Sequence, residues 1–440
     1  MKSEKLLVWA SAFALSLAAP AAHAGVKSSE FHGQFRVNSY HQTHSEDTLD
    51  TGSTSESRLR YRPTWDVEMD NGVKLHLQMN IGHIRDGAFN HRNDHTGGAP
   101  SFGLRHGMVT GPIVDGWSYT GGIVPVSDHF GDTLFSGDWD FNPLTYMVNG
   151  TVAGMVDVRV GFATVTEGAT GDAELIFLDA DLTDLGLGFS VYNYSDRSGG
   201  NSVTTKDIRQ TYLGLNYSKD YQSVAVTAFA LYNMGTIKKG NAAGKDFDNS
   251  GFAFKLGGTV PVGPAKIGIQ GLYSSGDKKY ATMAAGETDA DSFITPMSIY
   301  GGHGYWGMTG NLTVQGPTDT GIDNPVRLDG GSYNNQNVGL GITTIQANVD
   351  VPVIKDKLSF YGAVGYFMLS DNPTAMADDV GTDIYAQLTY DFGDSLKLQA
   401  GGDFAALGEG HHMSNALKGA GGKLASDNVF QLFARFQLEY

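Results

Sequence analysis

Arginine recurs at every second position of one short segment, where Arg58, Arg60 and Arg62 alternate with Leu59 and Tyr61. Successive side chains of an extended strand point to opposite faces, so the three guanidinium groups share one face and the apolar side chains share the other. Guanidinium groups bind carboxylates and phosphates, often through two parallel hydrogen bonds. The spacing therefore predicts a cationic row that faces anions.

The same alternation gives further cations to neighbouring segments. Residues 30–41 place His32, Gln34, Arg36 and Asn38 on one face, and the final strand contributes Arg435. We expect one basic wall, defined as the residues Arg36, Arg58, Arg60, Arg62, Lys74 and Arg435, with His76 beside it and with Arg159 and Asp157 on the same face farther along the chain. An alternative is purely structural, in which the arginines pair with Asp66, Glu68 and Asp157 to balance buried charges.

The N-terminal residues have the features of an exported protein. Two lysines precede an apolar stretch from Leu6 to about Ala22, and the small-x-small sequence AHA occupies residues 22–24. This pattern is typical of a secretory signal peptide, so we expect residues 1–24 to be cleaved and residues 25–440 to form one domain. No later segment is apolar for about 18 continuous residues, so no transmembrane helix is predicted.

Composition limits the classes that remain. The chain of 440 residues has 41% hydrophobic residues, 18% charged residues, no cysteine and a net charge of −17. The missing cysteine excludes a disulfide scaffold, and the negative charge argues against a nucleic-acid partner. Aromatic residues are spread along the whole chain in short alternating runs, which argues against disorder.

Runs with a period of two predict about eighteen strands, within a range of sixteen to twenty. They lie near 30–41, 57–68, 73–84, 102–112, 117–126, 145–152, 156–166, 173–182, 187–194, 208–218, 223–233, 251–260, 267–274, 338–350, 358–368, 383–390, 396–406 and 428–440. Tight connections such as residues 69–72 interleave with long polar ones such as 86–101, 127–144 and 275–337. This rhythm is typical of an up-and-down transmembrane barrel with short periplasmic turns and long extracellular loops.

The final eleven residues, FQLFARFQLEY, alternate apolar and mostly polar side chains and end on Tyr440. A closed barrel must pair this strand with the first one, EFHGQFRVNSY, or leave a sheet edge unsatisfied in lipid. Such an ending resembles the assembly signal of bacterial outer-membrane proteins, and the layout resembles homotrimeric porins and, more loosely, alginate-export-type barrels. The resemblance implies the outer membrane, contacts with lipid and lipopolysaccharide, recognition of Tyr440 by the barrel-assembly machinery, and a homotrimer.

The segment SDHFGDTLFSGDWDFNPL, residues 127–144, is similar to the third loop of general porins, which folds into the lumen. The resemblance implies that Asp128, Asp132, Asp138 and Asp140 face the basic wall across a constriction. Phe130, Phe135, Trp139 and Phe141 are then expected to pack the loop against the inner wall. The longer segment 275–337 is a rival plug or lid, and its stretch MTGNLTVQ could hide a further hairpin.

We expect a porin for passive diffusion of ions and small hydrophilic solutes, with mild charge selectivity. It needs no cofactor and no metal, and the absence of the G-x-S-x-G, Walker A and H-E-x-x-H motifs argues against an enzyme. Two alternatives stay open. One is a specific channel or exporter for an anionic oligosaccharide, guided by the arginines, and the other is a structural or adhesive barrel with a closed lumen.

Overall fold

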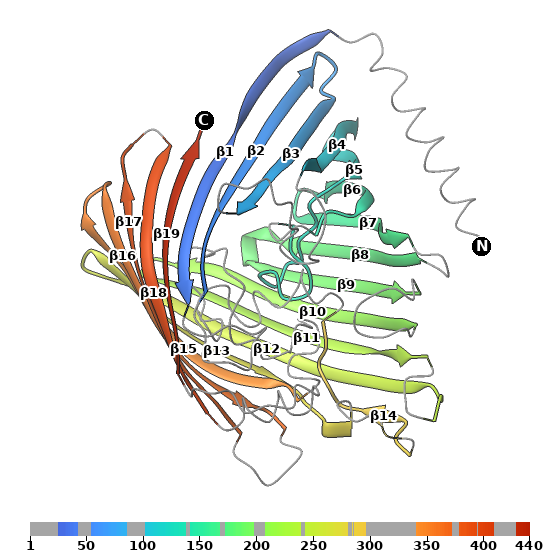
Figure 1. The fold of residues 1–440 in the computed structure, drawn as a ribbon. Helices are drawn as coiled ribbons and strands as arrows, with labels where there is room; N and C mark the ends of the chain where they lie inside the picture. The colour runs from blue at the N-terminus through green and yellow to red at the C-terminus, as the bar shows by residue number, and fades with distance from the viewer. Residues whose placement is uncertain are drawn as a thin grey trace.

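The strands of the computed structural model form one closed ring (Figure 1). The structure describes residues 25–42, 54–85, 102–137, 141–167, 172–197, 207–238, 243–279, 284, 286–295, 340–371, 378–393, 395–408 and 428–440. Eighteen antiparallel strands make up the ring, which confirms the all-β, up-and-down barrel that the alternation predicts.

Neighbouring strands of the ring follow one another in the chain and are joined by antiparallel ladders. The strands are β1 (Val26–Gln42), β2 (Thr54–Met69), β3 (Lys74–Arg85), β4 (Phe102–Val114), β5 (Trp117–Ile123), β6 (Leu144–Val152), β7 (Val156–Glu167), β8 (Asp172–Leu182), β9 (Leu187–Asp196), β10 (Ile208–Tyr221), β11 (Val224–Ile237), β12 (Phe247–Val262), β13 (Ala265–Ser274), β15 (Ile342–Ile354), β16 (Leu358–Leu369), β17 (Asp379–Asp391), β18 (Leu396–Leu407) and β19 (Asn428–Glu439). The weakest predicted strands, 102–112 and 173–182, correspond to β4 and β8.

Two small elements supplement the ring. A 3-10 turn, η2 (Thr183–Leu185), joins β8 to β9, and the two-residue strand β14 (Asp289–Ala290) runs parallel to the start of β12. The predicted hairpin at MTGNLTVQ, residues 308–315, lies outside the described residues. Within the described part of the chain, no helix has the length and apolar character needed to cross a membrane.

The seam of the ring joins the two ends of the described chain. β1 pairs with β19 in an antiparallel ladder that places Phe35 opposite Leu438. The backbones of Gly33 and Tyr440 exchange two hydrogen bonds of 3.0 and 3.1 Å, and the Tyr440 hydroxyl bonds the hydroxyl of Tyr61 on β2. The predicted pairing of the last strand with the first is therefore confirmed, and the sheet has no free edge there.

The two faces of the wall differ in polarity. Leu215, Leu256 and Ile345 point outward and are each about 60% exposed, whereas the inward residues Asn233 and Asp383 are fully buried. Apolar side chains outside and polar side chains inside are the arrangement that a barrel needs in lipid. The same alternation that sets the strand pairing thus also sets which side chains face the lumen.

The outward face of β12 offers a test of its position in the bilayer. Leu256 lies in the middle of the strand and Val262 at its end, and both are exposed on the outer face. We expect Leu256→Arg to lower the free energy of unfolding by about 2–4 kcal/mol, and Val262→Arg by about 0–1 kcal/mol, because the cost of an arginine falls with distance from the midplane. Denaturant titration of the protein refolded in lipid vesicles measures both values, and equal effects would contradict the predicted depth.

Candidate functional site

The arginines of the basic wall lie on the inner face of the seam. Antiparallel pairing places Arg36 opposite Arg60 of β2, and Asn38 opposite both Arg58 and Arg435. Residues directly opposite in neighbouring strands share a face, so these groups converge on one patch of the lumen wall. Arg36 and Arg435 are buried and Arg60 is half-buried, while the side chain of Arg58 lies outside the described residues.

Several hydrogen bonds of these arginines go to neutral amides. Arg60 donates to the Gln34 side chain at 2.6 Å, and Arg435 donates to the Asn38 side chain at 2.8 Å. Arg62, the remaining member on β2, donates to Asn80 of β3 at 3.0 Å. An amide is a neutral acceptor, so these particular bonds do not cancel the charge of the guanidinium groups.

The carboxylates that the structural alternative assigned to the arginines have other partners. Asp66 contacts His32 and His76, each at 2.6 Å, and Glu68 contacts Lys27 at 2.6 Å. Asp157, farther round the ring, accepts hydrogen bonds from two threonine hydroxyls. Lys74 lies opposite Glu68 across the ladder of β2 and β3 and is exposed at the turn end of the wall.

Between β5 and β6, residues 124–137 and 141–143 lie against the inner wall; these described residues are called the inner loop below. Its residues Phe130, Phe135 and Phe141 are buried, and Phe130 and Phe135 make edge-to-face contacts with Tyr192 of β9. Phe130 also sits directly over Gly214 of β10, where a Cβ would overlap its ring. The three aromatic residues are thus the anchors that the sequence predicts, and Trp139 lies outside the described residues.

Asp128 shapes the inner loop from within. One carboxylate oxygen accepts from the backbone N–H groups of Phe130 and Asp132, and the other accepts from those of Leu134 and Phe135. Burial raises the pKa of Asp128 to about 7; the charge of Asp132 adds to the rise, and the N–H donors oppose it. The prediction that Asp128 faces the basic wall is wrong, because both its oxygens point into the loop backbone.

The other carboxylates predicted to face the basic wall are Asp132, Asp138 and Asp140. Asp132 occupies the left-handed backbone region, with a φ of 63°, at the tip of the turn that Asp128 closes. Asp138 and Asp140 lie outside the described residues. Their proposed role at a constriction stays a prediction.

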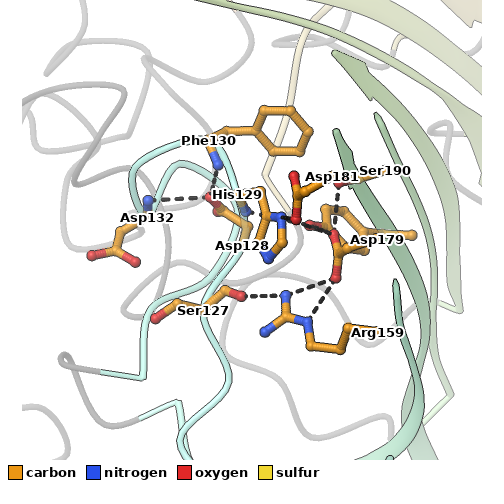
Figure 2. Close-up of polar contacts among 10 residues, drawn as sticks. Ser127, Asp128, His129, Phe130, Asp132, Arg159, Asp179, Asp181 and Ser190 are labelled. Atoms are coloured by element: carbon orange, nitrogen blue, oxygen red, sulfur yellow. Dashed lines mark hydrogen bonds and ion pairs between the residues drawn. The ribbon is translucent and has the colours of Figure 1, made fainter. Parts of the chain in front are cut away.

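Acidic groups that contact the loop come instead from the wall (Figure 2). Arg159 of β7 forms an ion pair of 2.7 Å with Asp179 of β8 and donates to the backbone carbonyl of Ser127 at 2.8 Å. His129 of the loop lies 3.0 Å from Asp181. Arg159 therefore points inward, as the alternation predicts, but it holds the loop and Asp179 rather than Asp157.

A polar recess of about 340 Å³ borders this contact. Its lining includes Ser118, Asn149, Thr151, Asp157, Arg159 and Asp181. The recess lies on the inner face, because the lining side chains of β6, β7 and β8 share one side of their ladders. Solvent in the lumen therefore reaches the place where the loop meets β7 and β8.

Arg105 of β4 is a loop contact that sequence reasoning missed. A register shift between β3 and β4 interrupts the alternation, so that Arg105 and buried His106 are both turned to the inner side. Arg105 donates to the backbone carbonyl of Gly137 at 3.1 Å and to the side chain of Gln78 at 2.8 Å. The adjacent basic residues Arg105 and His106 are the one feature of the sequence that could indicate this bulge.

No group of three or more His, Cys, Asp or Glu residues that could hold a metal ion occurs within the described ranges. The ring of His41, near the end of β1, bonds the hydroxyl of Ser55.

The barrel has the fold of Occ outer-membrane porins of known structure. OccK2 (OpdF) and OccK9 (OpdG) of Pseudomonas aeruginosa both match with a TM-score of 0.57, at 11% and 10% identity. These matches cover 94% of this chain and 98% and 99% of the two structures. OccAB1 of Acinetobacter baumannii matches with a TM-score of 0.53 at 11% identity, over 94% of this chain and 97% of that one. No family model matches the sequence, and no curated protein does.

Replacement of Gly214 tests the packing of the inner loop. We expect Gly214→Ala to destabilise the protein by about 1–3 kcal/mol, because the new methyl group overlaps the Phe130 ring and crowds Leu231. Gly258→Ala is the matched control, since its Cβ would have 3.7 Å to the nearest atom. Denaturant titration in vesicles compares the two, and an unchanged Gly214→Ala protein would contradict the described packing.

Asp128→Asn tests the turn inside the loop. The new NH2 group cannot accept hydrogen bonds, so two backbone N–H groups lose their acceptor at a cost of about 1–3 kcal/mol. We expect faster hydrogen exchange at Leu134 and Phe135 than in the unmodified protein. Asp132→Asn is the control, because asparagine tolerates the left-handed conformation there. Equal protection in both variants would exclude the described role of Asp128.

Proposed function

We propose that the protein is an outer-membrane porin that lets ions and small hydrophilic solutes diffuse through its lumen. The observation that carries the proposal is the row of inward arginines on β19, β1 and β2 inside a closed barrel with an apolar exterior. A ring of eighteen strands is too wide to be filled by its own wall side chains, so the inward polar groups border an aqueous passage. The fold shared with Occ porins supports the same function.

The inner loop is proposed to set the width of the passage. It is attached to β4 through Arg105 and to β7 through Arg159, so it covers the inner face of this side of the wall and narrows the lumen from there. Positive charge on β19, β1 and β2 lies across the lumen from the carboxylates of β8, which gives a transverse field. Such a field orients dipolar solutes and tunes ion selectivity.

The inward guanidinium charge favours anions in this proposal. A general pore passes large, weakly selective currents, whereas a specific channel for an anionic oligosaccharide passes small currents that its ligand blocks. Rows of arginine and amide side chains are compatible with both, so a block by an added oligosaccharide of uronic acids distinguishes them. Assembly as a trimer, contacts with lipopolysaccharide and recognition of Tyr440 by the assembly machinery are further parts of the proposal.

Removal of charge from the basic wall tests the selectivity. We expect the double variant Arg60→Ala and Arg62→Ala to shift the reversal potential in asymmetric KCl toward cation preference, because two inward positive charges are lost. Lys219→Ala with Lys238→Ala removes the same charge from residues outside the lumen, where Lys219 and Lys238 bond Asp184 and Asp246. A shift of equal size in both double variants, or in neither, would refute a selective basic wall.

A further inference from the structure

The inner loop is attached to the wall by contacts of two kinds. Most are independent of pH: Arg159 and Arg105 donate to the carbonyls of Ser127 and Gly137, and Phe130 packs on Gly214. One contact depends on a proton. His129 lies 3.0 Å from Asp181 and 3.9 Å from Asp179, and its imidazole forms an ion pair only when it is protonated (Figure 2).

Asp179 does not need the charge of His129. Its carboxylate already pairs with Arg159 and accepts hydrogen bonds from the hydroxyls of Ser190 and Tyr192. These donors come from β7 and β9, on either side of its own strand, and Asp179 is fully buried among them. The charge of Asp179 is therefore balanced whether or not His129 carries a proton.

Asp181 has no such balance. It lies directly opposite Asp157 in the ladder of β7 and β8, and Asp157 is bonded only to the hydroxyls of Thr151 and Thr183 in the described structure. Two like charges directly opposite each other destabilise a sheet pair. No lysine or arginine forms an ion pair with Asp157 or Asp181 within the described ranges, so a charged His129 is the cation that reaches this pair.

We propose that His129 is the positioning residue of the inner loop, and that its protonation fixes the loop on β8. The inference rests on the proposed function only where loop position is taken to set the pore opening. The ion pair exists only while the imidazole carries its second proton, so the loop is held more tightly at lower pH. The recess beside Asp181 gives solvent protons access to the contact.

Other titratable groups face His129, and their effect on the loop must be distinguished from the effect of His129. The loop itself contributes Asp128 and Asp132, β8 contributes Asp179 and Asp181, and β9 contributes the hydroxyl of Tyr192, to which the His129 backbone N–H donates. Burial raises the pKa of Asp128 to about 7, so this group changes charge in the same range. The variants must therefore be compared at one pH at a time, where the charge of Asp128 is common to all of them.

Spin labelling of the loop tip measures its position without relying on current. The chain has no cysteine, so Asp132→Cys creates one labelling site on the full chain refolded in vesicles. In this background we compare unmodified His129, His129→Gln, which is never charged, and His129→Lys, which stays charged at both pH 5 and pH 8. The measured quantity is the mobile fraction of the label.

We expect the mobile fraction of the protein with His129 to move from that of His129→Lys toward that of His129→Gln as the pH is raised from 5 to 8. The mobile fraction should be about two- to five-fold larger in His129→Gln than in His129→Lys, as for a half-exposed ion pair. Asp181→Asn should abolish the difference between them, and His41→Gln, near the end of β1, should leave the profile unchanged. Agreement of the unmodified protein with His129→Gln at both pH values, or identical Gln and Lys variants, would overturn the inference.

Conductance recorded on the same proteins separates this inference from the proposed function. If the mobile fraction of the label depends on residue 129 but the barrel passes no current, the proposed pore is refuted and the positioning role of His129 remains. If the barrel conducts but neither the mobile fraction nor the conductance depends on residue 129, the positioning role is refuted and the pore remains.

Discussion

The hydrogen bonds of the seam between β1 and β19 are the constraint on which the rest of the structure depends. A backbone N–H or C=O group that faces hydrocarbon without a partner costs several kcal/mol, so a sheet in lipid has to close. Closure fixes the register of the first and last strands, and the register places Arg36, Arg60 and Arg435 together. A patch of charge assembled from both ends of the chain thus follows from backbone pairing rather than from attraction between the side chains, which repel one another.

Closure of this many strands also leaves an interior that the wall cannot fill. The inner loop occupies part of it, and the wall holds the loop with the same kind of residue that lines the opposite side. Arg105 and Arg159 donate to loop carbonyls, whereas the described bonds of Arg60, Arg62 and Arg435 go to amides. Arg105 also donates to the Gln78 amide and Arg159 also pairs with Asp179, so each of these two arginines ties the loop to a polar group of the wall.

Alternation along the sequence predicts the strands and the face on which each side chain lies. It does not predict features that depend on contacts between distant segments. The strand count, the closing pair and the inward direction of Arg36, Arg60 and Arg435 follow from the period of two. The bulge at Arg105 breaks that period without a visible signal. The sequence does not reveal the turn around Asp128, because an aspartate in a loop looks the same in the sequence whether its carboxylate faces solvent or accepts hydrogen bonds from its own backbone.

Asp128 gathers four N–H groups from residues 130–135, so the tip of the inner loop is braced by its own backbone before it touches the wall. A braced tip is displaced as a single body and does not uncoil gradually. Besides its hydrogen bonds to β4 and β7, the tip packs through buried aromatic side chains on β9 and β10. Any displacement of this element would accordingly strip a whole aromatic cluster from the wall at once.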